Sequence, residues 1–337
     1  MGKFIEEFYY GNLDPQARST KQNKAVQKQM EVLMLNEDYL TENLSGESKK
    51  KFLEFVNDYV YSVNHFVRAC ETLSSNKMEI FAGGKGLNQS IALARAGTNV
   101  VHGAKIGKDG DFLIDTLKSS GVNVDRIVKT TDSCGHAIIQ VDNNGQNSIL
   151  LYGGTNQCMN KEYVENFLSD ATEKDILLLQ NEVNGLDFIF KIAKEKGVQI
   201  AFNPSPINDN IKNLPLEQVA WWFVNEIEAC ELFGSNNPEE ICNNFIEKYP
   251  HSNLILTLGK NGSIFVNSNT RIKQQIFDAK VVDTTAAGDT FTGYFISAIL
   301  NNHTFDYALK LATKASSISV SRKGASASIP LLQEVVI

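Results

Sequence analysis

Small residues, a glycine and a carboxylate lie together in Thr284-Thr285-Ala286-Ala287-Gly288-Asp289, between an extended run and an apolar helical pattern. The first N–H groups of a helix have no partner inside the helix, and the helix dipole favours an anion in front of them. A carboxylate beside such an anion can take the proton from a hydroxyl group that attacks a phosphoryl group. The stretch therefore predicts a phosphoryl-transfer centre, although an ordinary helix start with a Thr or Asp cap would use the same residue types.

A second glycine-rich turn, Gly83-Gly84-Lys85-Gly86, also precedes a helical pattern. It is not a Walker A loop, because the six-residue loop and the Ser or Thr after the lysine are missing. Lys85 and Asn88 are three residues apart, so their side chains would reach the same side of the first helical turn. The turn is equally compatible with a site for the hydroxyl groups of a polar ligand and with a plain glycine turn that carries a solvated lysine.

The elements that must position these residues alternate between strand and helix patterns from residue 100 onward. The wholly apolar run 176–179 is typical of a strand in a sheet buried on both faces, and Asn143-Asn144-Gly145 predicts a hairpin. The alternation predicts an α/β fold with a mostly parallel sheet, helices on both faces and ligands beyond the carboxyl ends of the strands. Polar stretches follow five of the predicted strands: 180–182, 203–206, 225–228, 257–259 and 283–289.

The composition sets limits on the class of protein. The chain has 337 residues, of which 42% are hydrophobic and 21% charged, and its net charge is -7. These values suit a soluble globular protein of one or two domains, and the acidic balance argues against a nucleic-acid partner. The five cysteines and five histidines are scattered without metal-site spacing, which predicts reduced thiols and no zinc. Because no early apolar run resembles a signal peptide or a membrane span, we expect a cytoplasmic protein without membrane contact.

Residues 1–76 differ from the rest of the chain, because they are rich in Lys, Glu, Gln and Asn. Apolar residues at helical spacing over 30–44 and again over 52–67 predict a helical hairpin that ends near residues 74–77. Such an apolar stripe suits a core or a protein-contact face, so the N-terminal helices are a candidate surface for a protein partner. The segment Phe8–Gln16 resembles the opening of a family of small helical bacterial proteins of unknown function.

From Ala82 to the C-terminus, the chain resembles the ribokinases of the PfkB sugar-kinase family. The motifs that carry the resemblance are Gly83–Gln89, Asn203–Pro206, Asn225–Glu228, Thr257–Gly262, Asp283–Gly293 and Arg322–Ala325. The resemblance implies a ribokinase-like kinase domain over residues 77–337, after the helical hairpin of residues 1–76. It also implies ATP-dependent phosphorylation of the primary hydroxyl of a sugar, with D-ribose as the first candidate and ribose 5-phosphate as the product.

The resemblance assigns roles in phosphoryl transfer and in ligand binding. Asp289 would deprotonate the sugar hydroxyl, and an anion hole would be formed by the backbone N–H groups of Ala286, Ala287 and Gly288. The sugar would be held by Gly84, Lys85, Asn88, Glu182 and Asp289. The nucleotide would be bound by Asn225, Thr257, Gly259, Gly262, Gly288 and Thr313, the last of which replaces a histidine that is common in ribokinases.

The resemblance also implies two metal ions besides ATP. Glu228, in the Asn-x-x-Glu motif, would help to organise Mg²⁺ through water. K⁺ would be enclosed by loop residues, several of them through backbone carbonyl groups: Asp283, Thr285, Ser319, Arg322, Gly324 and Ser328.

One departure from the family pattern concerns the start of the domain. A ribokinase begins with an inner sheet strand that bears an Asn-x-Asp sugar-binding motif and continues through lid strands. Here Asn57-Asp58 lies inside the helical stripe over 52–67, so we expect the first strand to be missing and the lid to be reduced to the hairpin around 143–145. This loss would weaken sugar binding and leave backbone groups bare beside the sheet. The alternative function is therefore a truncated, non-catalytic protein that retains nucleotide binding or a contact surface.

Overall fold

The computed structural model describes residues 50–53, 56–144 and 146–337, which belong to the compact unit Ser48–Ile337. The predicted helical stripe over 30–44 and the segment Phe8–Gln16 lie outside the described residues. Within the described part of the chain, no helix is long and apolar enough to cross a membrane.

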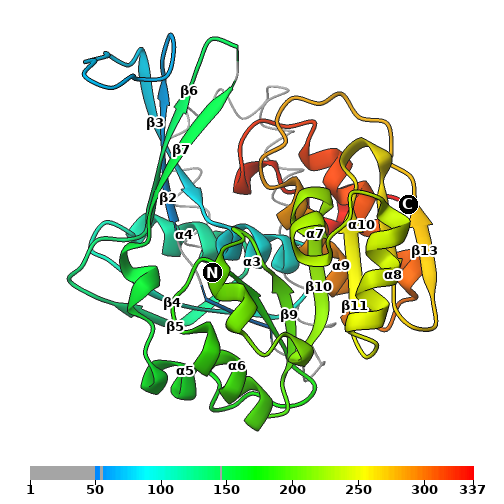
Figure 1. Ribbon diagram of the computed structural model, residues 1–337. Coiled ribbons are helices and arrows are strands. Elements are labelled where there is room, and N and C mark those ends of the chain that lie inside the picture. The colour runs from blue at the N-terminus through cyan, green and yellow to red at the C-terminus, as the bar shows by residue number, and fades with distance from the viewer. Residues whose placement is uncertain (1–49, 54–55, 145) are drawn as a thin grey trace, which may run out of the picture. The chain divides into compact units, whose positions relative to one another are not determined.

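A nine-stranded sheet forms the centre of the unit, and Figure 1 shows its strands running between helices. In order across the sheet, the strands are β13 (Arg271–Gln274), β12 (Ser263–Val266), β11 (Asn253–Thr257), β10 (Val219–Asn225), β9 (Gln199–Asn203), β8 (Ile176–Gln180), β1 (Lys50–Leu53), β4 (Val100–Ile106) and β5 (Asn123–Lys129). Neighbouring strands are parallel from β5 to β11, whereas β12 and β13 are antiparallel. The structure therefore confirms the predicted α/β fold with a mostly parallel sheet.

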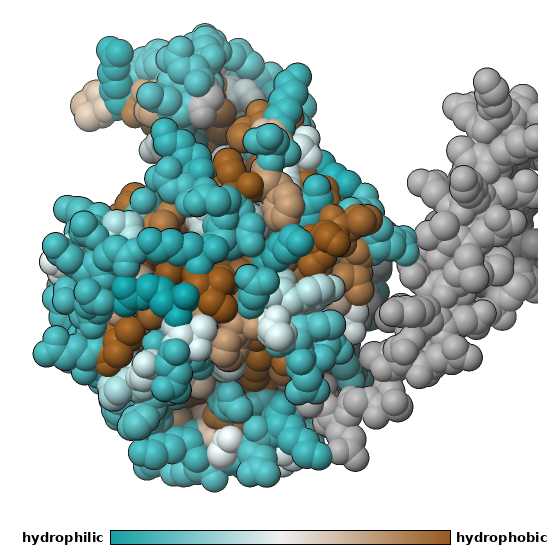
Figure 2. Space-filling view, turned by 90° about the vertical axis from the view of Figure 1, so that its right-hand side faces the viewer, coloured by the Kyte–Doolittle hydropathy of each residue, from teal (hydrophilic) through white to brown (hydrophobic). Residues whose placement is uncertain are grey.

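Helices cover both faces of this sheet. The described residues form the α-helices α3 (Lys85–Arg95), α4 (Asp111–Ser119), α5 (Lys161–Phe167), α6 (Leu186–Glu195), α7 (Glu226–Phe233), α8 (Pro238–Lys248), α9 (Ala287–Leu300) and α10 (Phe305–Ser319). One hydrophobic cluster contains side chains of α5 to α8, and a second contains side chains of α3, α4, α9 and α10. Strand residues alternate between the clusters, since Leu177 and Leu179 belong to the first and Ile176 and Leu178 to the second. Hydrophilic residues cover most of the face in Figure 2, and hydrophobic residues appear between them as separate patches.

A second sheet of four strands projects from this body, as Figure 1 shows. We call it the lid sheet, and its order is β3 (Lys77–Gly83), β2 (Val56–Ser62), β6 (His136–Val141) and β7 (Asn147–Tyr152). The pair β2–β6 is parallel, and the pairs β2–β3 and β6–β7 are antiparallel. The predicted reduction of the lid to a single hairpin is therefore wrong.

The predicted second helix, over residues 52–67, is also wrong. Residues 50–53 form β1 and residues 56–62 form β2. β1 fills the inner place of the main sheet, where Lys50 pairs with Val100 of β4 and with Ile176 of β8. The apolar spacing fits a helix, but the β-branched and aromatic residues of β2 also suit a pleated strand, and pairing with distant strands decides between the two. Because the first strand is present, the reason for expecting a truncated, non-catalytic protein disappears.

Candidate functional site

Asp289 lies buried in the first turn of α9 and is held by two side chains of α3. The Asn88 amide donates from Nδ2 to Asp289 Oδ2 over 3.1 Å, and Gln89 donates from Nε2 to Oδ1 over 2.9 Å. Burial raises the pKa of the Asp289 carboxyl, and the negative charge of Glu182 raises it further. The positive charge of Lys85 and the two amide donors act in the opposite direction. The structure thus brings the predicted base together with the predicted sugar-binding residues Lys85, Asn88 and Glu182.

The close approach of α3 and α9 depends on Gly293, one turn after Asp289. A Cβ atom at this position would overlap Ala92 Cβ and would lie 2.8 Å from the backbone nitrogen of Leu93. Glycine therefore lets the two helix backbones come near enough for Asn88 and Gln89 to reach the carboxylate. Further along α9, Ser297 donates to the carbonyl of Ala96 over 2.9 Å and so fixes the same pair of helices.

The predicted anion hole occupies the turn into α9. Ala286 adopts the left-handed conformation with φ 59°, which turns the chain sharply before the first helical residue. The N–H group of Ala287 donates to the carbonyl of Thr284 over 3.3 Å. A Cβ atom built on Gly288 meets nothing within 4 Å, so open space lies beside this backbone. The helix start can therefore receive an anionic group close to Gly288 and Asp289.

Asp58 is a further candidate site residue, which the sequence reasoning missed. It lies on β2 at the base of the lid sheet, and its carboxyl group packs so closely on Gly83 that a side chain there would overlap it. Burial, together with the negative charges of Glu182 and Asp289, raises the pKa of Asp58 to about 7. The available signal was Asn57-Asp58 followed by the aromatic and β-branched residues of β2, and the helical interpretation of residues 52–67 concealed it.

Two buried oxygen atoms near Asp289 have no hydrogen-bond partner among the described residues. They are Oδ1 of Asn88 and Oε2 of Glu182. Most buried polar atoms in proteins are hydrogen-bonded, so unpartnered oxygens beside a carboxylate indicate a place for a hydroxyl-bearing ligand or water. Carboxylate and amide oxygens accept hydrogen bonds from hydroxyl groups, which suits a sugar.

Four of the predicted nucleotide-binding residues, Asn225, Thr257, Gly259 and Gly262, lie at or just after the carboxyl ends of β10 and β11, while Gly288 lies on α9 and Thr313 on α10. Asn225 pairs with Thr257 in the register of these strands, so the two ends are neighbours. Gly259 has open space around the position of a Cβ atom, whereas Gly262 packs against the carbonyl of Gln274, which gives it a structural reason to be glycine. Thr313 is buried on α10, and its hydroxyl donates to the carbonyl of Leu309 over 2.7 Å.

Glu228 also has a structural role. Its Oε2 accepts from the backbone N–H of Asn225 over 3.0 Å, while the Asn225 side chain accepts from the N–H of Glu228, which completes a capping box at the start of α7. Among the described residues, no group of three or more His, Cys, Asp and Glu side chains could hold a metal ion. The donor set at Glu228 therefore fits a divalent ion only where phosphate oxygens and water complete its ligands.

The predicted K⁺ residues lie in the loop before α9, at the last residue of α10 and in the loop after α10, and Asp283 joins the two loops. Its carboxylate accepts from the N–H of Thr285 over 2.9 Å and from the N–H of Gly324 over 3.0 Å. Burial would raise the pKa of Asp283, but these donors and nearby Lys323 hold it below its ordinary value. The hydroxyl groups of Ser319 and Ser328 lie 2.8 Å apart and are buried. Carbonyl, hydroxyl and carboxylate oxygens form the donor set that an alkali cation prefers, so these loops fit K⁺.

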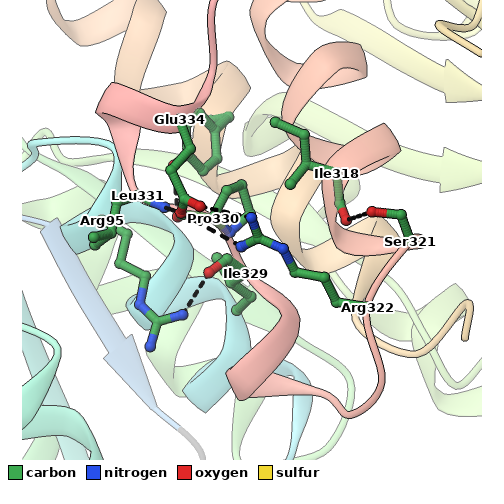
Figure 3. A network of polar contacts seen from close by, with 9 residues as sticks. Arg95, Ile318, Ser321, Arg322, Ile329, Pro330, Leu331 and Glu334 are labelled. Atoms are coloured by element: carbon green, nitrogen blue, oxygen red, sulfur yellow. Dashed lines mark hydrogen bonds and ion pairs between the residues drawn. The ribbon is translucent and has the colours of Figure 1, made fainter. Parts of the chain in front are cut away.

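The guanidinium of Arg322 is positively charged and pairs with Glu334 over 2.6 Å, as Figure 3 shows. Any contribution of Arg322 to a cation would therefore come from its backbone. Arg95, at the end of α3, donates to the carbonyl groups of Ser326 over 2.9 Å and Ile329 over 2.5 Å. One helix thus contacts the predicted base at its first turn and the predicted cation loop at its last.

Residues 51–332 match the pfkB family carbohydrate kinases, and residues 1–69 match a family of unknown function (DUF6809). The bifunctional ribokinase/ribose-5-phosphate isomerase A of Fructilactobacillus sanfranciscensis is 36% identical over 293 residues, which are 83% of this chain and 54% of that protein. The chain therefore spans about half the length of this bifunctional relative. The ribokinase of Staphylococcus aureus is 35% identical over 292 residues, which are 82% of this chain and 95% of that enzyme.

A solved structure with the same fold is the ribokinase of Cryptococcus neoformans in complex with ADP. It is 30% identical in sequence and has a TM-score of 0.76, and the match covers 87% of this chain and 99% of that chain. The family match over residues 51–332 includes the part in which the sequence reasoning expected no strand.

Proposed function

The chain belongs to the pfkB family of carbohydrate kinases, and we propose that it transfers the γ-phosphoryl group of ATP to the primary hydroxyl of D-ribose, giving ribose 5-phosphate. The observation that carries the proposal is the buried Asp289 carboxylate at the start of α9, held by Asn88 and Gln89 beside unpartnered oxygen atoms. The curated relatives described above are ribokinases, and the solved relative holds ADP, which supports both the acceptor and the nucleotide.

The sugar is held by polar groups of α3, the lid and the end of β8. Asp58 and Glu182 accept hydrogen bonds from its hydroxyl groups, and Asn88 offers its free Oδ1. Gly84 and Lys85 complete this set at the start of α3. Several buried acceptors discriminate strongly against ligands that lack a matching hydroxyl group, because the acceptors would then stay unpaired.

Phosphoryl transfer proceeds at the start of α9. Asp289 takes the proton of the primary hydroxyl, and the sugar oxygen forms a bond to the γ-phosphorus of ATP. The bond between the γ-phosphorus and the oxygen that bridges to the β-phosphate breaks, and ADP leaves with the electron pair. The N–H groups of Ala286, Ala287 and Gly288 stabilise the negative charge on the transferring group, and the N–H of Ala287 gives up its 3.3 Å bond to the carbonyl of Thr284 for this purpose.

The nucleotide and the metal ions occupy the neighbouring loops in this proposal. Asn225, Thr257, Gly259, Gly262 and Thr313 line the nucleotide. Mg²⁺ would be held by phosphate oxygens and by water on Glu228, and it would supply positive charge to the phosphates. K⁺ would be held by the oxygen atoms of two loops, contributed by Asp283, Thr285, Ser319, Arg322, Gly324 and Ser328.

A coupled assay of ADP release tests the proposal, with D-ribose, ATP, Mg²⁺ and K⁺. We expect ribose-dependent ADP release by the wild-type chain and a loss of roughly 10³-fold in kcat for Asp289→Asn, because the amide cannot accept the proton. Asp306→Asn is the matched control, since Asp306 is an exposed aspartate in the first turn of α10. Turnover of the wild type no higher than that of Asp289→Asn would refute the proposal.

A further inference from the structure

Two buried side chains, Gln180 and Gln89, connect the end of β8 to the carboxylate of Asp289. Gln180, the last residue of β8, donates from Nε2 to Oε1 of Gln89 over 2.5 Å. Gln89 in turn donates from Nε2 to Asp289 Oδ1 over 2.9 Å. The exposed fractions of Gln180, Gln89 and Asp289 are 2%, 1% and 8%, so water has little access to any of these bonds.

The direction of these two hydrogen bonds determines how the side-chain amide of Gln89 is oriented. Its side chain has an accepting oxygen at one corner and a donating nitrogen at the other. Because Gln180 supplies a donor to the oxygen, the nitrogen faces Asp289, which as a carboxylate can only accept. Without the donor from Gln180, the amide could rotate and bring its oxygen toward the carboxylate oxygen, which would be repulsive.

A purely structural role explains these residues poorly. The other residues of β8 are Ile176, Leu177, Leu178 and Leu179, all of which belong to the hydrophobic clusters. A glutamine in such a strand must be desolvated, and its burial is unfavourable unless its hydrogen bonds are made. The side chain of Gln180 donates its hydrogen bond to Gln89, which is 91 positions away in the sequence and lies on α3, outside the sheet.

We propose that Gln89 and Gln180 are positioning residues, which fix the plane of the Asp289 carboxylate and keep it ionised for proton removal. Asn88 holds the second oxygen, so the carboxylate has one amide donor on each side. Each donor, like the charge of Lys85, favours the charged form of Asp289 and opposes the effects of burial and of the negative charges of Glu182 and Asp58. The proposal rests on Asp289 as the base of the proposed kinase reaction, but its effect on the carboxylate itself can be measured without turnover.

The test uses Gln180→Met, which keeps the length and removes the donor at a residue that does not touch Asp289. The first measurement is the ionisation of Asp289 in protein labelled with ¹³C at the aspartate carboxyl carbon, with Asp289→Asn to assign the signal. We expect the midpoint of Asp289 to rise by about one pH unit in Gln180→Met and by about one to two units in Gln89→Met. The acid limb of the pH profile of kcat should move to higher pH in the same order.

Two further variants distinguish positioning from stability. Gln199→Met is the control, because Gln199 lies at the other end of the neighbouring strand β9 and accepts from Trp221 Nε1. It should leave both the midpoint and the profile unchanged. Gln180→Glu is nearly isosteric, and at low pH its buried, protonated acid can still donate to Gln89, so it should shift the acid limb less than Gln180→Met.

The possible outcomes distinguish a failure of the proposed kinase function from a failure of the positioning proposal. Wild-type protein without ribose-dependent turnover would refute the proposed function, while the carboxyl titration would still decide the role of the glutamines. An unchanged Asp289 midpoint in folded Gln180→Met would overturn the positioning proposal. A loss of kcat that is equal at every pH would overturn the inference that the glutamines keep Asp289 ionised, because loss of that effect must move the acid limb. If Gln180→Met does not fold, Gln89→Met and Gln180→Glu decide between the same outcomes.

Discussion

Asp58 interacts electrostatically with two other carboxylates, Glu182 and Asp289, at the place proposed for the sugar. Burial and these two charges raise its pKa to about 7, well above the ordinary value of 3.8. An arrangement of this kind is unfavourable in the empty protein and becomes favourable when hydroxyl groups or a cation enter. The residue is therefore expected to contribute to binding at the expense of stability.

Replacing Asp58 with asparagine should stabilise the empty protein at high pH and weaken sugar binding. Because the folded protein holds the proton more tightly than the unfolded chain, the contribution of Asp58 to stability falls from about pH 4 and is fully lost above pH 7. At pH 8 we expect Asp58→Asn to unfold with a free energy about 1–3 kcal/mol higher than the wild type, and at pH 4 with little difference. Urea unfolding at the two pH values measures this effect.

The same variant should raise KM for ribose about tenfold or more, because buried acceptors of sugar hydroxyl groups discriminate strongly. Asp115→Asn, at an exposed position of α4, is the control for both measurements. If the stability of Asp58→Asn depended on pH in the same way as that of the wild type, the raised pKa would not belong to Asp58.

At the scale of elements, α3 organises the site. Its first turn carries Lys85, Asn88 and Gln89, and its last residue, Arg95, binds the carbonyl groups of the 326–329 loop. The position of α3 against α9 therefore sets the distance between the base and its partners. This distance depends on one position without a side chain, Gly293.

Gly293→Ala should push the two helices apart. The new methyl group would overlap Ala92 Cβ and crowd the backbone of Leu93, which is costly in a close-packed core. We expect a loss of about 1–3 kcal/mol in the free energy of unfolding, measured in urea, and a lower kcat because Asp289 lies one turn away. The double variant Ala92→Gly/Gly293→Ala should recover part of both losses. If Gly293→Ala had the stability and kcat of the wild type, the close approach of α3 and α9 would not depend on the absence of a side chain at residue 293.

At the scale of the whole molecule, the unit Ser48–Ile337 contains both the complete nine-stranded sheet and the four-stranded lid sheet. The pfkB match, residues 51–332, lies inside this unit. All residues assigned here to the sugar, the nucleotide, the anion hole and the cation belong to it. We therefore propose that the kinase domain begins near residue 48, earlier than the boundary at residue 77 expected from the sequence.

A chain of residues 48–337 should consequently keep the activity of the full chain. We expect kcat and KM for ribose within about twofold, since none of the proposed site residues is removed. A chain of residues 64–337 is the matched comparison, because it also loses β1 and β2 and would expose the edges of β4 and β8. Activity assays and thermal unfolding compare the three chains. A folded but inactive 48–337 chain would mean that residues 1–47 contribute to catalysis.

Several features of this protein could be predicted from the sequence, because they depend on neighbours in the chain. Glycines at turns, apolar runs such as 176–179 and the small residues before Asp289 indicate strands, helix starts and an anion site through local backbone geometry. The regular alternation of these signals is enough to predict the α/β fold and the edge of the sheet at which polar residues gather.

Other features were decided only by tertiary structure. The spacing of apolar residues over 52–67 fits a helix, and the strands β1 and β2 form because distant partners, Val100 and Ile176 for Lys50, complete their hydrogen bonds. The interaction of Asp58 with Glu182 and Asp289 likewise depends on residues that are far apart in the chain, and so does the hydrogen bond between Gln180 and Gln89. Local preferences differ by small free energies, whereas burial and the pairing of backbone groups involve larger ones, so long-range contacts determine the outcome wherever the local pattern permits two structures.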